Sequence, residues 1–219
     1  MLNNNDKQHE LNWIKNNGLI PAIIQHSVSG EILMLGYMNK QSMSETEKTG
    51  YVTFFSRSKN RLWVKGETSG NLLKFINWYP DCDSDSLLIL VLPQGYTCHK
   101  NTSSCFYPAS TDFSFLYQLE NIISMKKKHN YALTQNQKEL SSYTSDLYSN
   151  GIERIAQKVG EEGLETALAA VSRNSTALVN EAADLIYHLL VLLQHESLTF
   201  NKIIQELKNR NKLKNKKIN

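Results

Sequence analysis

The sequence predicts two domains, a β-rich α+β domain over residues 1–110 and an all-α domain over residues 111–219. Short apolar runs separated by Gly, Ser and Asn dominate the first half, which is typical of strands joined by turns. After Phe106 the apolar residues recur at helical spacing instead. The polar segment 108–112 between the two patterns is typical of a linker, so the boundary is expected there.

The first half is expected to contain several strands and one helix. The apolar runs that predict strands are residues 20–25, 31–37, 51–55, 62–65, 72–79 and 87–92. Ser29-Gly30 between the first two runs predicts a hairpin. Asn39 can cap a helix that Gly50 would end. The run 87–92 lacks alternation, which predicts a central strand buried on both faces.

Helical periodicity predicts the elements of the second half. The expected helices are one over Leu116–Met125 that ends in Lys126-Lys127-Lys128, one that contains Arg154–Glu165, and one over Thr176–Gln194 capped by Ser175. Residues 129–142 are expected to be a loop. The Lys- and Asn-rich residues 207–219 are expected to be a frayed, solvated helix end, with a nucleic-acid-binding tail as the alternative.

The composition is ordinary for a globular protein. The chain has 219 residues, of which 41% are hydrophobic, and its net charge of +3 predicts no strong attraction to nucleic acid or membrane. Residues 1–10 are polar and lack the apolar core of a signal peptide, and the longest apolar run, 87–92, is too short to span a bilayer. An odd number of cysteines without a signal peptide indicates a reducing compartment. We therefore expect a cytoplasmic protein.

The segment 81–106 carries the most informative chemistry of the first half. It holds all three cysteines and, at alternate positions, three aspartates: Cys82, Cys98 and Cys105 with Asp81, Asp83 and Asp85. If the backbone is extended here, the three carboxylates share one face of a strand. Carboxylate oxygens suit Mg²⁺, whereas thiolates suit Zn²⁺. We interpret the segment as two metal sites, with a solvated turn and buried core thiols as the alternatives.

The spacing of the cysteines favours a catalytic zinc site over a structural one. It contains no C-x-x-C knuckle, and three thiolates without a fourth cysteine leave one coordination position for water. Zinc lowers the pKa of bound water to about 7. His99, next to Cys98, is either a fourth ligand or the general base for that water.

A polar and basic loop, Ser56–Arg61, lies between two predicted strands. Arginine presents a fork that matches phosphate oxygens, and serine hydroxyls add donors. For Lys59 and Arg61 we expect a solvated turn.

Separate blocks within residues 18–107 together resemble phosphoribosyl-AMP cyclohydrolase. The blocks are Gly36-Tyr37-Met38-Asn39, Ser56-Arg57-Ser58, residues 62–70, residues 81–85, Cys98-His99 and Ser104-Cys105-Phe106. The resemblance implies zinc on the three cysteines, shared between the two subunits of a homodimer, and Mg²⁺ on the three aspartates. It also implies that Arg57 and Ser58 bind substrate phosphate and that Lys65, with Glu67 and Ser69, lies at the site.

The chain departs from the usual cyclohydrolase pattern at Tyr96 and Asn101, where the family has Pro and Gly. Asparagine tolerates a left-handed backbone better than most residues, so the change at Asn101 is mild. Tyr96 is expected to alter the rigidity of the loop and to leave the metal ligands in place.

Acidic residues on two helices of the second half form another candidate site. At about 100° per residue, Arg154, Lys158, Glu161, Glu162 and Glu165 fall on one helical face. Alone this pattern favours a solvated face with ion pairs. The next helix is almost wholly apolar yet carries Glu181, Asp184 and His188, and buried carboxylates need partners or metals. Glu162, Glu165, Glu181 and Asp184 would converge between antiparallel helices as a Mg²⁺ cage.

With Ser142-Tyr143-Thr144, Gly151 and residues 154–163, this acidic pattern resembles phosphoribosyl-ATP pyrophosphohydrolase, an all-helical nucleotide pyrophosphatase. The resemblance implies Lys158 and Glu161 as catalytic candidates and Arg154 as a substrate-binding residue. The whole chain therefore resembles the fused bifunctional histidine-biosynthesis enzymes.

The joint resemblance implies two consecutive hydrolyses of small nucleotides. Phosphoribosyl-ATP would lose pyrophosphate, and the adenine ring of phosphoribosyl-AMP would then open between N1 and C6 with zinc-activated water. The cofactors implied are Zn²⁺ and Mg²⁺, with no nucleic acid or membrane partner. One rival is a house-cleaning nucleotide pyrophosphatase with an inactive first half. The other is a zinc module that binds RNA through Arg57–Arg61.

Overall fold

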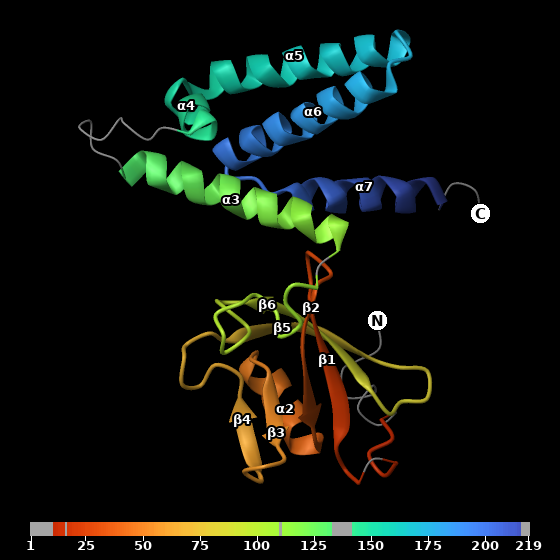
Figure 1. Cartoon of the computed structure of the whole chain (residues 1–219). Coiled ribbons are helices and arrows are strands. Elements are labelled where there is room, and N and C mark those ends of the chain that lie inside the picture. The colour runs from red at the N-terminus through yellow and green to blue at the C-terminus, as the bar shows by residue number, and fades with distance from the viewer. Residues whose placement is uncertain (1–10, 16, 110, 133–141, 216–219) are drawn as a thin grey trace. The chain divides into compact units, whose positions relative to one another are not determined.

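The computed structural model describes residues 11–15, 17–109, 111–132 and 142–215. The chain divides into two compact units, Met1–Ser114 and Phe115–Asn219. The first unit carries all the described strands and the second is helical, which confirms the predicted fold class (Figure 1). The division falls in the first turn of a helix, just after the predicted boundary.

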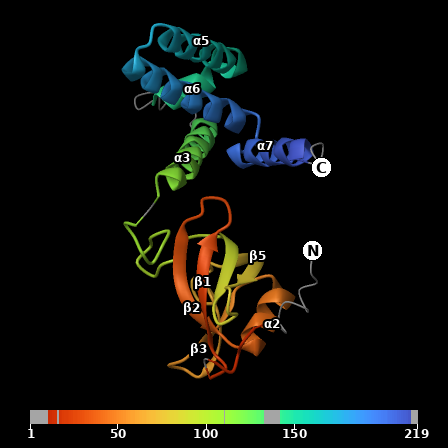
Figure 2. The ribbon, with the colours of Figure 1, turned by 90° about the vertical axis from the view of Figure 1, so that its right-hand side faces the viewer.

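A four-stranded sheet forms the centre of the first unit. Its order is β2-β1-β6-β5, and it comprises β1 (Ile20–His26), β2 (Ile32–Met38), β5 (Leu73–Pro80) and β6 (Leu87–Pro93). β6 pairs parallel with β1 and antiparallel with β5, so the run 87–92 is central, as predicted (Figure 2). The predicted burial on both faces is wrong, because Leu87, Ile89 and Val91 are buried whereas the alternate residues of β6 are half-buried. β1 and β2 form the predicted hairpin, in which Gly30 adopts a left-handed φ of 73°.

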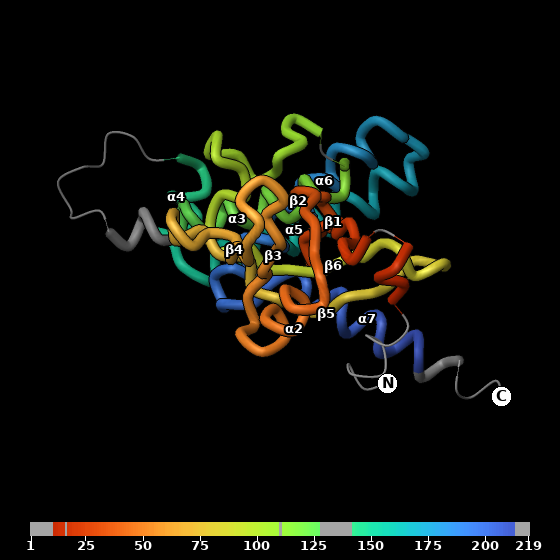
Figure 3. The backbone as a smooth tube through the Cα atoms, turned by 90° about the horizontal axis from the view of Figure 1, so that it is seen from below, coloured from red at the N-terminus to blue at the C-terminus, as the bar shows by residue number. Residues whose placement is uncertain are grey.

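A separate two-stranded ribbon and one helix complete this unit. The ribbon pairs β3 (Thr53–Ser56) with β4 (Arg61–Val64) and is the orange pair of segments in Figure 3. Helix α2 (Lys40–Thr49) begins as predicted, because Asn39 Oδ1 accepts the Ser42 backbone N–H at 2.8 Å. It ends as predicted at Gly50, whose φ is 75°.

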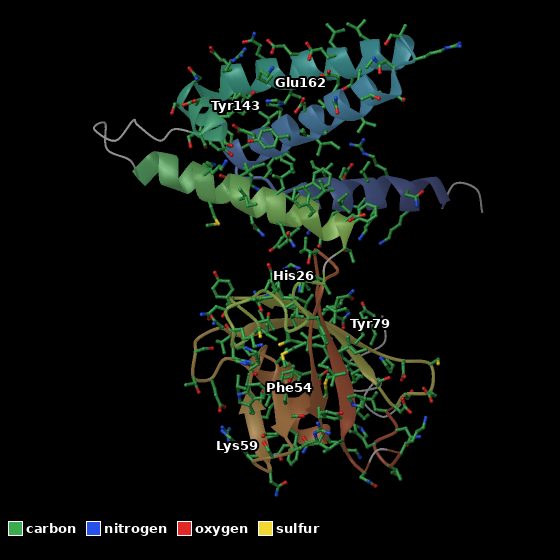
Figure 4. The ribbon with its side chains drawn as sticks, viewed as in Figure 1. His26, Phe54, Lys59, Tyr79, Tyr143 and Glu162 are labelled. Atoms are coloured by element: carbon green, nitrogen blue, oxygen red, sulfur yellow. The ribbon has the colours of Figure 1, made fainter. Side chains whose placement is uncertain are left out.

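The core of the first unit lies between the sheet and the β3–β4 ribbon. Alternate residues of β1, Ile20, Ala22 and Ile24, are fully buried. The Phe54 ring, labelled in Figure 4, packs so closely on β2 that a Cβ at Gly36 would lie 2.3 Å from it. A buried side chain of this size contributes about 1.5–3 kcal/mol, so any larger residue at Gly36 would displace part of the core.

His26, also labelled in Figure 4, ends β1 as a buried residue with 6% exposure. Its Nδ1 accepts the backbone N–H of Val28 at 3.2 Å and of Ser29 at 3.0 Å. Burial lowers the pKa of His26. Below about pH 6.5 the unfolded chain therefore binds a proton here that the folded chain does not, and the free energy of unfolding falls as the pH is lowered.

We expect His26→Asn to weaken this pH dependence, because an Asn oxygen can accept the same N–H groups but does not titrate. The measurement is urea unfolding at about pH 7.5 and pH 5.5, a window in which the unfolded chain takes up a proton at His26 more readily than the folded chain. Tryptophan fluorescence reports this unit alone, since Trp13, Trp63 and Trp78 are the three tryptophans of the chain. An equal loss of stability in both proteins would contradict the expectation.

The second unit consists of helices. They are α3 (Asp112–Ala132), α4 (Tyr143–Ser149), α5 (Gly151–Val171), α6 (Ser175–His195) and α7 (Phe200–Asn215). α5 and α6 lie side by side as an antiparallel pair (Figure 1). The core of the second unit includes Ile123, Leu147, Ile155 and Leu190, which come from four different helices.

Three details of the predicted helices are wrong. α3 continues through its lysines to Ala132, since lysine is a good helix former, so the first residues of the predicted loop 129–142 are helical. Most of the remaining loop, 133–141, lies outside the described residues. α4 was not predicted. α6 is capped by Asn174, whose Oδ1 accepts the Ala177 N–H at 3.0 Å, and Ser175 is its first residue.

Within the described residues, α6 is long and apolar enough to cross a membrane by length and composition alone. Core helices of soluble proteins meet the same criterion. The first half of α6 is less buried than its apolar composition predicts. The buried residues of this helix all lie in its second half: His188, Leu190, Val191 and Leu193.

Candidate functional site

The three aspartates of the first unit gather in a turn, although the prediction that they lie on an extended strand is wrong. Residues 81–86 precede β6, and Ser84 has a left-handed φ of 59°. Asp81 accepts the backbone N–H groups of Asp85 and Ser86, each at 3.0 Å, and the Ser86 hydroxyl. These donors lower the pKa of Asp81 to about 2. Ligand oxygens of Asp81, Asp83 and Asp85 consequently lie within 4.8 Å of one another.

Lys15 provides a cation at this acidic turn. Its Nζ lies 2.5 Å from Asp83 Oδ2 and also pairs with Asp85. The two carboxylates raise the pKa of Lys15, so the ammonium stays charged. The Lys15 ammonium shows that these carboxylates attract a cation, and an all-oxygen set suits Mg²⁺. The turn therefore fits the predicted ion.

Two of the three cysteines share a pocket of about 500 Å³. The lining includes Met34, Trp63, Lys65, Tyr96, Cys98, His99 and Cys105. The thiols of Cys98 and Cys105 interact with each other. A backbone N–H from Lys100 and the Thr102 side chain lower the pKa of Cys98, whereas burial raises that of Cys105. Lys65 is 8% exposed, and burial lowers its pKa.

Cys82 lies apart from this pair within one chain. It is exposed in the acidic turn, and no group of three ligand atoms within 4.8 Å that the structure describes contains a cysteine. Two adjacent thiols nevertheless fit a soft cation such as zinc. A complete three-thiolate set would need Cys82 from elsewhere, which is what sharing between subunits predicts.

The loop around Cys98 places the other predicted residues at the pocket. His99 Nδ1 lies 3.9 Å from Cys98 Sγ, and His99 lines the pocket. Asn101 adopts a left-handed φ of 58°, the conformation expected from its substitution for Gly. Tyr96 also lines the pocket and is exposed.

The predicted phosphate ligands of the basic loop lie off this pocket. The Arg57 guanidinium stacks 3.7 Å above the Tyr37 ring. Ser58 Oγ lies 3.5 Å from Ser56 Oγ. Neither Arg57 nor Ser58 is among the pocket-lining residues described.

In the second unit, ligand oxygens of Glu162, Glu165 and Glu181 lie within 4.8 Å of one another, between α5 and α6. Partial desolvation, together with the charges of Glu162 and Glu181, raises the pKa of Glu165. A divalent cation would relieve this repulsion, so the set fits Mg²⁺. The exposed Asp184 is not part of the group, and its backbone oxygen accepts a hydrogen bond from His188 at 2.8 Å.

The predicted basic residues of α5 approach the same carboxylates. Lys158 Nζ lies 2.7 Å from Glu162 Oε1 and 3.0 Å from Glu161 Oε2, and both contacts raise its pKa. Arg154 Nη1 lies 3.5 Å from Glu161 Oε1. Glu162 is 5% exposed, and Lys158 is the basic partner of its buried carboxylate.

Tyr143, which the sequence singled out only within the block Ser142-Tyr143-Thr144 and without a role, reaches this site from α4. Its hydroxyl lies 2.8 Å from His188 Nε2, while His188 Nδ1 lies 3.8 Å from Glu162 Oε1 (Figure 4 labels Tyr143 and Glu162). The pair is formed by residues 45 positions apart, so no local pattern could have predicted it.

Comparison with known proteins finds two families along the chain. The phosphoribosyl-AMP cyclohydrolase family matches residues 34–107, and the phosphoribosyl-ATP pyrophosphohydrolase family matches residues 128–211. The chain is 77% identical to the histidine biosynthesis bifunctional protein HisIE of Blochmanniella floridana, over 96% of this chain and 98% of that protein. It is 57% identical to HisIE of Yersinia pestis, over 92% and 95%, and 54% identical to HisIE of Salmonella typhimurium, over 93% and 97%.

Proposed function

The chain belongs to the family of bifunctional histidine-biosynthesis proteins, and from this premise we propose that a zinc site in its first unit and a magnesium site in its second carry out the two hydrolyses. It is a bifunctional hydrolase with a cyclohydrolase and a pyrophosphohydrolase domain. One observation supports the assignment of metals above all others. The thiol pair lies in a pocket of the first unit, whereas the three glutamates converge between two helices of the second.

In the first unit, Cys98 and Cys105 would hold zinc together with Cys82 of a second copy. When bound, this ion supplies a water that is acidic enough to react near neutral pH. Trp63 and Met34 offer the adenine ring an apolar wall in the pocket. Ring opening adds the water oxygen to C6, breaks the N1–C6 bond and delivers a proton to N1. His99 is placed to transfer that proton, and Lys65 contributes positive charge.

In the second unit, Glu162, Glu165 and Glu181 would hold Mg²⁺, with Asp184 as the proposed fourth ligand. The ion neutralises phosphate charge when bound. Water adds to a phosphorus, a P–O bond breaks and pyrophosphate leaves. Lys158, which contacts Glu161 and Glu162, would stabilise the developing negative charge. Arg154 would bind substrate phosphate, and Glu161 holds both basic side chains near the site.

We further propose a homodimer in the cytoplasm. The separation of Cys82 from the Cys98–Cys105 pair supports zinc ligands that come from two chains. All three cysteines are free. The acidic turn would hold Mg²⁺ near the substrate phosphates.

The test is product identification from phosphoribosyl-ATP with the full chain, alongside metal analysis. We expect pyrophosphate, the ring-opened nucleotide and bound zinc. Absence of pyrophosphate release from folded protein supplied with both ions would refute the proposal. Supplying phosphoribosyl-AMP directly distinguishes the proposed function from the rival one, because a pyrophosphatase with an inactive first unit would not open the adenine ring.

Lys15→Met is expected to make the first unit more responsive to Mg²⁺. Without the ammonium, three neighbouring carboxylates lose their counter-charge, so the metal-free variant should unfold at a lower temperature than wild type. Added Mg²⁺ no longer competes with Lys15 and should raise the unfolding temperature by more than in wild type. Thermal unfolding followed by tryptophan fluorescence measures both effects.

Lys48→Met is the control for Lys15→Met, because it removes one positive charge from a 74% exposed side chain of the same unit. An identical Mg²⁺ response in Lys15→Met and wild type would show that Lys15 does not occupy the cation position.

A further inference from the structure

A second cavity, of about 310 Å³, lies at the β3–β4 ribbon. Its lining consists of Ser56, Lys59, Arg61, Trp63, Glu67 and Thr68. Three of these residues, Trp63, Glu67 and Thr68, also line the pocket that holds the thiols of Cys98 and Cys105. The two cavities therefore adjoin, with Trp63 as a shared wall.

The second cavity is built for an anion. It brings together two cations, Lys59 and Arg61, and two hydroxyls, Ser56 and Thr68. Its one carboxylate, Glu67, is already paired, since its Oε1 lies 2.5 Å from Arg61 Nη2. Arg61 lowers the pKa of Glu67, so the pair stays ionised and the cavity retains a net positive charge from Lys59.

The positions of both cations are set by the ribbon. Arg61 Nη1 donates to the Leu62 carbonyl at 2.7 Å, and Glu67 Oε2 accepts the Val64 N–H at 3.3 Å, so the guanidinium is held on two sides. The Lys59 backbone N–H donates to Ser56 Oγ at 3.3 Å, and Asn60 turns the chain with a left-handed φ of 49°. Figure 4 labels Lys59 on this ribbon.

We propose that this cavity is the subsite for a phosphomonoester of the nucleotide whose base occupies the thiol pocket. The proposal rests on the cyclohydrolase function proposed above and assigns Lys59 and Arg61 as the phosphate-binding cations. A dianionic phosphate is matched by a guanidinium, an ammonium and neighbouring hydroxyls. Both residues are exposed, Lys59 in the turn 57–60 and Arg61 directly after it, as expected from sequence, and both also line a cavity next to the reacting site.

The size and connection of the cavities suit such a ligand. The thiol pocket, about 500 Å³, is large enough for a purine, and small-molecule sites typically span about 300–1,000 Å³. A ribose would pass Trp63 and Thr68 and place its phosphate in the second cavity. Arg57, stacked on the Tyr37 ring, lies outside both linings.

The test compares AMP with adenosine, which differ only in the phosphate, on the zinc-loaded full chain without Mg²⁺. Binding is followed by the indole N–H NMR signal of Trp63, assigned with Trp63→Phe. We expect wild type to bind AMP about tenfold or more tightly than adenosine, the gain typical of charge-assisted hydrogen bonds. In Lys59→Met/Arg61→Gln this preference should fall to about threefold or less, with adenosine affinity unchanged.

Lys48→Met controls for the loss of charge from the same unit and should keep the full preference for AMP. The proposal is overturned if the double variant still prefers AMP as strongly as wild type does, or if Lys48→Met loses the preference equally. The readout needs no turnover, so a chain that fails to open phosphoribosyl-AMP but shows the expected AMP preference would refute ring opening and leave the subsite standing. In an active chain the double variant should raise KM for phosphoribosyl-AMP about tenfold, with kcat little changed.

Discussion

Cys105→Ser is expected to abolish zinc binding and ring opening while leaving pyrophosphate release unchanged. The Cys105 thiol interacts with that of Cys98 in the pocket of the first unit. A serine hydroxyl is a poor replacement for a thiolate on a soft cation. Substituting a residue that only contacts a metal ligand typically lowers metal affinity or activity about 10–100-fold. We therefore expect the loss of a ligand itself to reduce the rate of ring opening by about a hundredfold or more.

Three measurements on Cys105→Ser check this prediction: zinc per chain, ring opening of phosphoribosyl-AMP and pyrophosphate release from phosphoribosyl-ATP. Loss of both activities would contradict the assignment of the two reactions to separate sites. Full zinc content with normal ring opening would remove Cys105 from the ligand set.

The same variant also tests whether zinc ligands are shared between subunits. Chains with Cys82→Ser and chains with Cys105→Ser are each expected to be inactive in ring opening. When the two variants are mixed and their subunits exchange, about half of the dimers should contain one chain of each kind. Each such hybrid has one complete zinc site and one defective site, so ring-opening activity should return to about a quarter of the wild-type value. A mixture that stays inactive while hybrids form would show that each site takes its thiols from one chain.

Glu181→Gln is expected to abolish pyrophosphate release while ring opening of supplied phosphoribosyl-AMP continues. Glutamine keeps the shape of the side chain but removes one of three negative charges that lie within 4.8 Å of one another. The metal site then loses a ligand charge, and we expect a fall of about a hundredfold or more in pyrophosphate release. Mn²⁺ binding followed by electron paramagnetic resonance should weaken in parallel.

Folding should survive Glu181→Gln, which makes the result easy to interpret. The charge of Glu181 contributes to the raised pKa of Glu165, so the substitution relieves repulsion in the metal-free protein. The unfolding temperature without metal should therefore not fall. Normal pyrophosphate release would exclude Glu181 from the metal site. Glu206→Gln serves as the control, because it removes one negative charge from a 55% exposed side chain of the same unit.

Local sequence signals were sufficient for most of the fold. Asn39 and Gly50 set the ends of α2 through hydrogen bonds and a left-handed residue within the helix itself. The apolar run of β6 correctly predicted a central strand, although only one of its faces is fully buried. The resemblance to two families also predicted which residue types carry the chemistry, because thiolates and carboxylates select different cations whatever their surroundings.

The sites themselves were decided by tertiary structure. Lys15 reaches Asp83 across 68 positions, and a turn, not a strand, gathers the three aspartates. Asp184 shares a helical face with Glu181 in the sequence pattern, yet the described packing leaves its side chain outside the acidic group.

Lys59 and Arg61 lie at an exposed turn, as the sequence predicts, but only the fold shows that they also line a cavity beside the thiols. The sequence by itself therefore determined most of the backbone elements and the types of side chain available for chemistry, which depend on neighbours along the chain and on side-chain type. The tertiary structure determined which groups meet, because the distance between side chains far apart in sequence is set by how the elements pack.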